Sequence, residues 1–300
     1  MKKVITLLLA LLLFALPAFA AAETVATSFY PIYLITINLT HGVDGVEVHN
    51  LAAPGTGCLH DYQLQTSDMK ALAQADVFFI NGAGMESYLT HVYDAFPNLP
   101  VVEASTGVEL LDDDDMPVAI GEGETEVNAH IWLDPKNVII MAQNLCAGLV
   151  EAMPEHQAEF EANRDAYCAR MEALDAELTE GLKDLPNKDI ITFHEAFPYF
   201  AKAYGLNVVA VVNREPGDAL SPARLSELVK LVQSLGAPPL FVEPQYEDMA
   251  AQTLSQETGA PVYTLDPAVT GPEDEEEALT YYETVMRTNM ATLQEALGAN

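Results

Sequence analysis

The sequence predicts an α/β protein in which a single long, rigid helix joins two Rossmann-like lobes. Three observations lead to this prediction. Short apolar segments alternate with amphipathic ones in both halves of the chain, as in parallel strands connected by helices. The strand-like segments are apolar at consecutive positions, as in Val77-Phe78-Phe79-Ile80, which is typical of a parallel sheet covered on both faces. Between the halves lies a charged segment that has no internal proline and carries an apolar stripe.

The N-terminal residues 1–22 have the composition of a secretory signal. Lys2 and Lys3 precede an apolar run over 4–16, and small residues follow Pro17. The run is too short to span a bilayer, and no lipobox cysteine lies near the cleavage site. We therefore expect a soluble protein that is secreted across the inner membrane into the periplasm or another extracytoplasmic space.

The first lobe is expected over residues 23–153. Strands are predicted at 24–30, 46–52, 77–81 and 101–104, and helices at 32–39, 67–74 and 86–96. Residues 112–126 are rich in Asp, Glu and Gly, which predicts a surface loop.

The linker helix is expected within residues 154–186. Its apolar stripe consists of Tyr167, Met171, Leu174, Leu178, Leu182 and Leu185. Their spacing of three and four residues is that of one amphipathic helix face. A coiled coil is the alternative, but the stripe is short and its charges do not follow heptads. A helix that spans two lobes fits better.

The second lobe is expected over residues 187–300. Strands are predicted at 189–193, 208–212, 240–242 and 262–265, and helices at 195–204, 221–235, 248–257 and 276–297. The helix at 221–235 is the best marked, because Ser221 can cap it, Pro222 occupies its first position and Gly236 ends it.

Charge and cysteine content limit the classes of function. The formal net charge is −32, with 45 acidic and 13 basic residues, which excludes non-specific nucleic-acid binding. Acidity alone indicates solubility and self-repulsion and does not indicate a metal site. Cys146 and Cys168 lie on helical segments either side of a break near Pro154 and are a candidate disulfide pair in an oxidising compartment. Cys58 is then left over.

Three histidines and one aspartate occupy loops or strand ends. His60 follows a turn-rich segment after a predicted strand, and His130 lies between the acidic loop and a helix. His194 and Asp266 each come directly after a predicted strand. Because ligands bind outside the carboxyl ends of strands in open α/β sheets, these side chains are expected to meet in the cleft between the lobes.

Three imidazoles and a carboxylate suit zinc better than calcium or magnesium, which prefer oxygen ligands. Glu243 and Glu195 are alternatives to Asp266 as the fourth ligand. Glu243 can instead support a ligand, and Glu195 is expected to begin the next helix, where the positive dipole end favours an acid. Cys58, two residues before His60, is a further soft donor.

Several segments resemble the zinc/manganese-type solute-binding proteins of metal ABC transporters. They are His60 followed by Ser67-Asp68-Met69-Lys70-Ala71-Leu72, Asn81-Gly82-Ala83-Gly84-Met85-Glu86, His130-Ile131-Trp132-Leu133-Asp134-Pro135, Phe193-His194-Glu195-Ala196-Phe197, Glu243-Pro244-Gln245 and Leu265-Asp266-Pro267. The resemblance covers essentially the whole mature chain.

This resemblance implies a fold, a ligand set and a function. The fold is two α/β lobes joined by one long helix, with the metal between them. The ligands are His60, His130, His194 and Asp266, and a histidine at the third position favours zinc over manganese. The implied function is a monomeric, non-enzymatic receptor that delivers the ion to a membrane permease. A manganese receptor, a zinc-dependent hydrolase and a surface adhesin are the alternatives.

Overall fold

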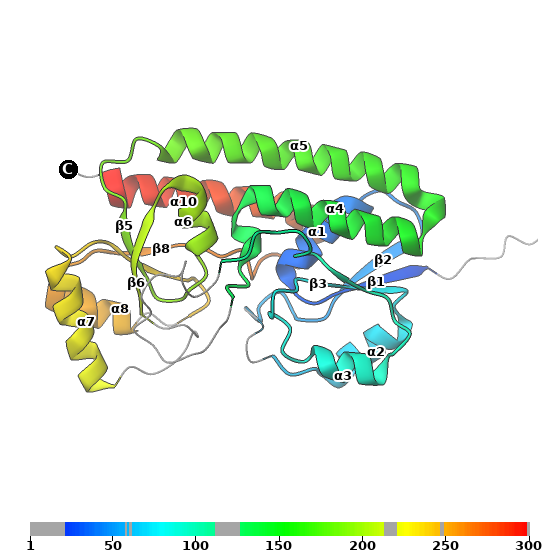
Figure 1. Ribbon diagram of the computed structural model, residues 1–300, viewed down its shortest axis with the longest axis horizontal. Helices are drawn as coiled ribbons and strands as arrows, with labels where there is room; N and C mark the ends of the chain where they lie inside the picture. The colour runs from blue at the N-terminus through cyan, green and yellow to red at the C-terminus, as the bar shows by residue number, and fades with distance from the viewer. Residues whose placement is uncertain are drawn as a thin grey trace, which may run out of the picture.

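The computed structural model describes residues 22–57, 59, 62–111, 127–212, 221–246 and 249–298. It contains two four-stranded parallel sheets, ordered β2-β1-β3-β4 and β6-β5-β7-β8, which lie side by side beneath one long helix (Figure 1). The strands are β1 Glu23–Thr27, β2 Val46–Asn50, β3 Val77–Ile80, β4 Val101–Glu103, β5 Asp189–Thr192, β6 Asn207–Val211, β7 Leu240–Val242 and β8 Val262–Thr264. The arrangement confirms the predicted fold class.

The two sheets repeat one topology. Thr27 of β1 pairs with Phe79 of β3 in the first sheet, and Thr192 of β5 pairs with Phe241 of β7 in the second. Strands β1 to β4 therefore correspond to β5 to β8, and their carboxyl ends are equivalent positions in the two lobes.

The first lobe contains a helix that is apolar on nearly all sides. Its helices are α1 Tyr30–Thr40, α2 Thr66–Gln74, α3 Leu89–Ala95 and α4 Pro135–Ala152, with short 3-10 helices η1 Ile131–Leu133 and η2 Pro154–His156. Every residue of α1 except Tyr33 is buried, as expected for a helix without a polar face. It packs against β2, α4 and α5.

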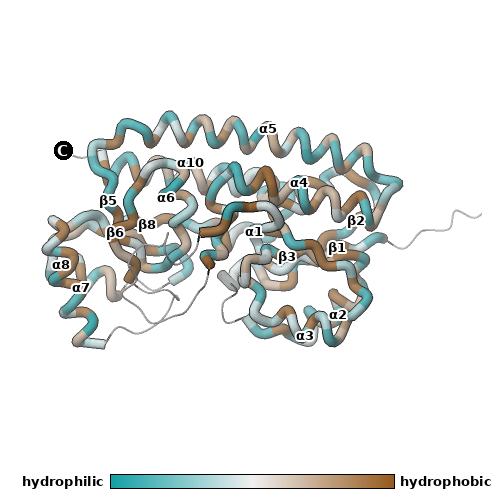
Figure 2. Tube along the Cα trace, in the orientation of Figure 1, coloured by the Kyte–Doolittle hydropathy of each residue, from teal (hydrophilic) through white to brown (hydrophobic). Residues whose placement is uncertain are grey.

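Helix α5 (Gln157–Leu182) runs past both lobes (Figure 1). Its buried residues are Phe160, Tyr167, Met171, Leu174, Leu178 and Leu182, so the predicted stripe is buried apart from Leu185, which lies beyond the helix. Hydrophilic residues cover most of its length (Figure 2). The helix contacts α1 and α4 in the first lobe and α6 and α10 in the second. It therefore packs against both lobes and joins them.

The second lobe departs from the predicted helices at two places. Its helices are α6 Pro198–Tyr204, α7 Pro222–Ser234, α8 Met249–Thr258, α9 Glu275–Ala278 and α10 Tyr281–Gly298. The single helix predicted at 276–297 is thus two helices. Ser221 caps α7 as predicted, since its hydroxyl accepts the Arg224 N–H at 3.3 Å.

The start of α6 corrects the interpretation of Glu195. The helix begins at Pro198, whose ring presets the first helical φ angle and whose missing N–H is not needed there. Glu195 instead lies in the turn between β5 and α6. Glu195 is therefore not the first residue of a helix, and the prediction that a helix dipole favours an acid at this position was wrong.

The segment between β8 and α10 crosses back onto the first lobe. The Tyr30 hydroxyl donates to the Pro272 carbonyl at 2.9 Å, and the Asn38 amide donates to the Leu279 carbonyl at 3.1 Å. Arg170 of α5 also pairs with Glu283 of α10 at 2.7 Å. These bonds, together with the packing of α5 against both lobes, hold the two lobes in one arrangement.

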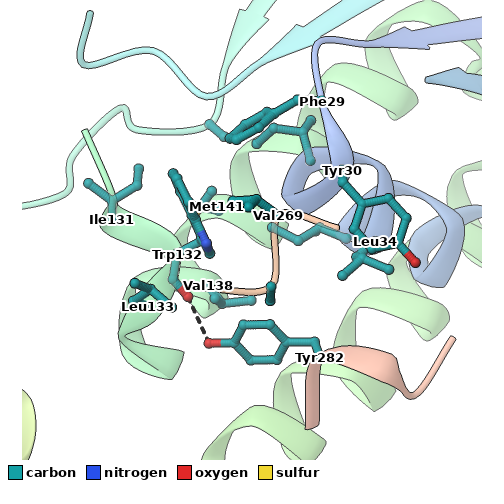
Figure 3. Close-up of a cluster of buried hydrophobic side chains, with 14 of the residues drawn as sticks. Phe29, Tyr30, Leu34, Ile131, Trp132, Leu133, Val138, Met141, Val269 and Tyr282 are labelled. Atoms are coloured by element: carbon teal, nitrogen blue, oxygen red, sulfur yellow. Dashed lines mark hydrogen bonds between the residues drawn. The ribbon is translucent and has the colours of Figure 1, made fainter. Parts of the chain in front are cut away.

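A buried aromatic cluster lies where the lobes meet (Figure 3). The Trp132 ring packs edge-on against Phe29, with ring centroids 5.1 Å apart. The Tyr282 hydroxyl donates to the Trp132 carbonyl at 2.7 Å. The cluster thus joins the start of α1, η1 and α10 through both apolar contact and a hydrogen bond.

The predicted disulfide is absent, because Cys146 and Cys168 are both free thiols. Cys146 is buried in the core, whereas Cys168 is half-buried at the edge of the same core. Burial raises the pKa of both thiols. Packing between α4 and α5 therefore closes this helical hairpin without a covalent link.

Residues 1–21 and 112–126 lie outside the described residues, so the signal segment and the acidic surface loop stay predictions. Among the helices of the described ranges, none is long and apolar enough to cross a membrane.

Candidate metal site

His194 stands two residues beyond the end of β5 and is buried. Its Nδ1 lies 2.8 Å from Oε1 of Glu243, the first residue after β7. Gln245 donates to the other oxygen of Glu243 at 2.6 Å. A carboxylate at Nδ1 favours the tautomer that carries its proton there. Nε2 is then the nitrogen that can bind a metal.

His130 is held in a similar way by a neutral acceptor. It directly precedes η1 and is buried. The side-chain oxygen of Asn128 accepts the backbone N–H of His130 at 2.9 Å and lies 3.2 Å from its Nδ1. The proton again belongs on Nδ1, so Nε2 of His130 is also the nitrogen suited to a metal.

The two imidazoles lie against each other across the lobe boundary. Their ring centroids are 4.7 Å apart and the ring planes meet at 80°. His130 comes from the segment that leads into α4, and His194 comes from the second sheet. Two sequence-predicted ligands that are 64 positions apart in the sequence are thus brought into contact.

Asp266 follows β8 and is fixed by several hydrogen bonds. Its Oδ1 accepts the Ala268 N–H at 2.8 Å, and the Tyr281 hydroxyl bonds to the same carboxylate. The Asn289 side chain bonds both the N–H and the carbonyl of Asp266, at 2.9 and 2.7 Å. Burial raises the pKa of the Asp266 carboxyl, the Ala268 bond opposes that shift, and the charge of Glu243 adds to it. Asp266 therefore lies in the electrostatic neighbourhood of the His194–Glu243 pair.

The structure unites only part of the predicted ligand set. His130 and His194 meet, but among the described residues no three His, Cys, Asp or Glu side chains gather closely enough to hold a metal ion. His60 and Cys58 lie outside the described residues. The described portion of the site is thus a histidine pair, with Asp266 beyond the end of β8, in the sheet that also contains β5.

Glu195 is buried beside His194, and its backbone carbonyl has a defined role. It accepts the side-chain N–H of Asn128 at 2.8 Å. The turn that carries His194 is thereby tied to the segment that carries His130.

A second bond ties the His130 segment to the Asp266 segment. The indole N–H of Trp132 donates to the Pro267 carbonyl at 2.7 Å, and both groups are buried. Trp132 packs in the buried core, and the hydrogen bond also fixes its position. The Tyr62 hydroxyl donates to Asp68 at 2.8 Å within the first lobe.

The repeated topology shows which first-lobe positions correspond to His194 and Asp266. His194 occupies the position that Phe29 occupies in the first lobe, counted from the equivalent residues of β1 and β5. Asp266 corresponds likewise to Ser105, counted from β4 and β8. The first lobe has Phe29 and Ser105 at these two positions, and His130 comes from a separate segment that precedes η1.

Four supporting residues had no role in the sequence-based prediction: Asn128, Gln245, Tyr281 and Asn289. Asn128 and Gln245 stand two residues from His130 and Glu243, so proximity is a signal that could have identified them. Asn289 lies 23 positions from Asp266, and nothing in the local sequence links the two.

The family model for periplasmic component A of the zinc-uptake complex matches residues 25–296. The chain is also similar to the zinc-binding protein AdcA of Streptococcus pyogenes serotype M3, with 31% identity over 291 residues. That match covers 90% of this chain and 55% of AdcA. The chain therefore spans about half the length of this relative.

Solved structures show the same fold. A zinc-bound deletion mutant of ZnuA is 26% identical, with a TM-score of 0.76, and the match covers 93% of this chain and 99% of that one. FpvC of Pseudomonas aeruginosa in complex with Mn²⁺ is 25% identical, with a TM-score of 0.81. That match covers 92% of this chain and 99% of FpvC. The chain belongs to the family of periplasmic component A proteins of zinc-uptake complexes, as the resemblance of its motifs predicted.

Proposed function

We propose that this protein captures a divalent transition metal ion outside the cytoplasm and passes it to the permease of an ABC transporter. The contact between His130 and His194 carries the proposal. Each ring has an oxygen acceptor at Nδ1, an arrangement that metal-binding histidines almost always show. Nε2 is thereby the nitrogen suited to a metal in both rings of this contact pair.

Zinc is the preferred ion in this proposal. Imidazole nitrogens bind Zn²⁺ at about 2.0–2.1 Å in four-coordinate sites, and hard cations such as Mg²⁺ favour oxygen. The relatives differ, since AdcA is named a zinc-binding protein and FpvC was solved with Mn²⁺. Manganese is therefore the alternative that a direct competition has to test.

We assign His60, His130, His194 and Asp266 as the ligands. Asp266 keeps ligand capacity, because an ionised carboxylate offers about four lone-pair sites and the Ala268 and Tyr281 bonds use two of them. Asp266 also lies one residue from Pro267, which accepts the Trp132 indole bond. The Asp266 segment is thus anchored to the segment that carries His130.

Carriage fits these residues better than hydrolysis. A catalytic zinc keeps one open position and needs a nearby base, whereas four protein ligands close the shell. Glu243 bonds His194 with one oxygen and Gln245 with the other. Its carboxylate is thereby committed to holding the imidazole and is not placed to activate water.

Competitive titration of metal-stripped mature protein with Zn²⁺ and Mn²⁺ tests the proposal. We expect zinc to win, and His194→Ala to weaken zinc binding by more than the roughly 10–100-fold typical of losing a supporting residue. His49→Ala is the matched control, because His49 is an exposed histidine in β2. Equal zinc affinity of the wild type and His194→Ala would remove the proposed site.

Delivery is tested separately in cells. We expect deletion of the gene to abolish growth in zinc-depleted medium, and added zinc to restore it. A deletion strain that takes up zinc normally but no longer attaches to surfaces would support an adhesin instead.

A further inference from the structure

Asn128 is buried, with about 1% of its surface exposed, and every polar group that it has is bonded. Its N–H donates to the Leu111 carbonyl at 2.8 Å, and its carbonyl accepts the Tyr199 hydroxyl at 2.9 Å. Its side-chain oxygen accepts from His130, and its side-chain nitrogen donates to the Glu195 carbonyl at 2.8 Å. A buried polar side chain is held rigidly when all its partners are present.

The side-chain oxygen and nitrogen of Asn128 bond to the two segments that carry His130 and His194. The oxygen bonds His130 at both its backbone N–H and its ring Nδ1, at 2.9 and 3.2 Å. The nitrogen bonds the carbonyl of Glu195, the residue next to His194. The geometry of the histidine pair thus depends on a side chain that contributes no ligand.

We infer that Asn128 is a positioning residue that locks His130 in the Nδ1–H tautomer and fixes its ring against His194 before metal arrives. Its purpose rests on the proposed function, because the fixed tautomer matters for a ligand at Nε2. A histidine that already has its proton on Nδ1 and its ring in place needs no rearrangement to bind. Such preorganisation strengthens binding by lowering its entropic cost.

Only an amide meets both requirements at this position. A carboxylate can accept the two N–H groups of His130, but it cannot donate to the Glu195 carbonyl and places two oxygens face to face. A methyl group does neither. Asn128→Asp therefore separates tautomer control from cross-lobe attachment, and Asn128→Ala removes both.

The direct test measures tautomers in metal-free mature protein labelled with ¹⁵N-histidine, by two-bond ¹H–¹⁵N correlation at pH 8. In the wild type we expect Nδ1–H for His130. In Asn128→Ala we expect His130 to populate the Nε2–H form, while His194 keeps its proton on Nδ1 through Glu243. Zinc affinity, measured against a chelator, should fall roughly 10–100-fold.

Asn144→Ala is the matched control. The Asn144 amide donates to the Ala104 and Thr106 carbonyls, each at 2.8 Å, within the first lobe. We expect this variant to lose stability and to keep both the wild-type tautomers and the wild-type zinc affinity. A loss of zinc affinity in Asn144→Ala equal to that in Asn128→Ala would show a general effect of destabilisation and would overturn the inference.

Asn128→Asp keeps the inference testable if the alanine variant does not fold. We expect it to retain Nδ1–H on His130, because a carboxylate accepts that proton, and an Nε2–H form would overturn the inference. A His130 tautomer that stays unchanged in a folded Asn128→Ala protein would also overturn it. Because the tautomer is measured without metal, its result stands even if the wild type binds no zinc, the outcome that defeats the proposed function.

Discussion

The Nδ1 atom of His194 lies 2.8 Å from Oε1 of Glu243, and both side chains are buried where β5 and β7 end. The pair joins neighbouring strands of the second sheet. Glu243 is in turn held by Gln245 at 2.6 Å. A chain of two hydrogen bonds within the second lobe therefore orients the His194 imidazole.

Glu243→Ala removes the acceptor at Nδ1 of His194. We expect zinc affinity to fall roughly 10–100-fold, because the imidazole loses both its orientation and its favoured tautomer. Glu243→Gln should lose less, since an amide oxygen can still accept from Nδ1. Competitive chelator titration measures both, with exposed Glu276→Gln as the control. Zinc affinity that is unchanged in Glu243→Ala would show that the pair is not needed for binding.

Glu86 makes stability depend on pH. Its two oxygens accept the N–H groups of Asn81 and Gly82 at 2.8 and 3.1 Å, and burial raises its pKa to about 7 from an ordinary value of 4.5. The folded state therefore binds this proton more tightly than the unfolded state does. The stabilisation is fully present below pH 4.5 and is lost as the pH rises through 7.

Glu86→Gln removes this ionisation. We expect the unfolding free energy of the wild type to fall by about 2 kcal/mol relative to Glu86→Gln between pH 5 and 8. Urea denaturation of the metal-free proteins at several pH values measures the difference. A difference that stays constant over this range would show that Glu86 does not titrate there.

Trp132→Phe keeps an aromatic ring but removes the indole N–H. The Pro267 carbonyl then loses a buried donor, which costs about 1–3 kcal/mol, and the smaller ring adds a cavity cost. We expect lower stability together with weaker zinc binding, because the bond ties the His130 and Asp266 segments. Urea denaturation followed by far-UV circular dichroism suits this variant, which removes the single tryptophan. Loss of stability with full zinc affinity would show that the bond does not position ligands.

Zinc is expected to leave the overall dimensions unchanged. Helices α5 and α10 are joined by the Arg170–Glu283 pair, and Tyr30 of α1 bonds the Pro272 carbonyl in the segment before α10. These ties resist rotation of one lobe against the other. Small-angle X-ray scattering should give the same radius of gyration with and without zinc, and a clear decrease on adding zinc would reveal hinge closure.

The sequence by itself determined the fold class and where the ligands were to be sought. Alternating apolar segments indicated two parallel sheets, and the stripe from Tyr167 to Leu182 indicated the helix between them. His194 and Asp266 were identified because each follows a strand. These are local signals, since strand and helix periodicity and strand ends are visible within a few residues.

Only the tertiary structure decided which side chains hold His130, His194 and Asp266 in place. Asn128 reaches Glu195 across 67 positions, and Trp132 reaches Pro267 across 135. The packing of α4 on α5 likewise left Cys146 and Cys168 as free thiols. The physical reason is that a hydrogen bond between lobes depends on how two folded sheets dock, and no periodicity within either segment encodes that distance. The sequence thus identifies His130 and His194 only as two separate residues, and docking of the lobes brings their imidazoles into contact.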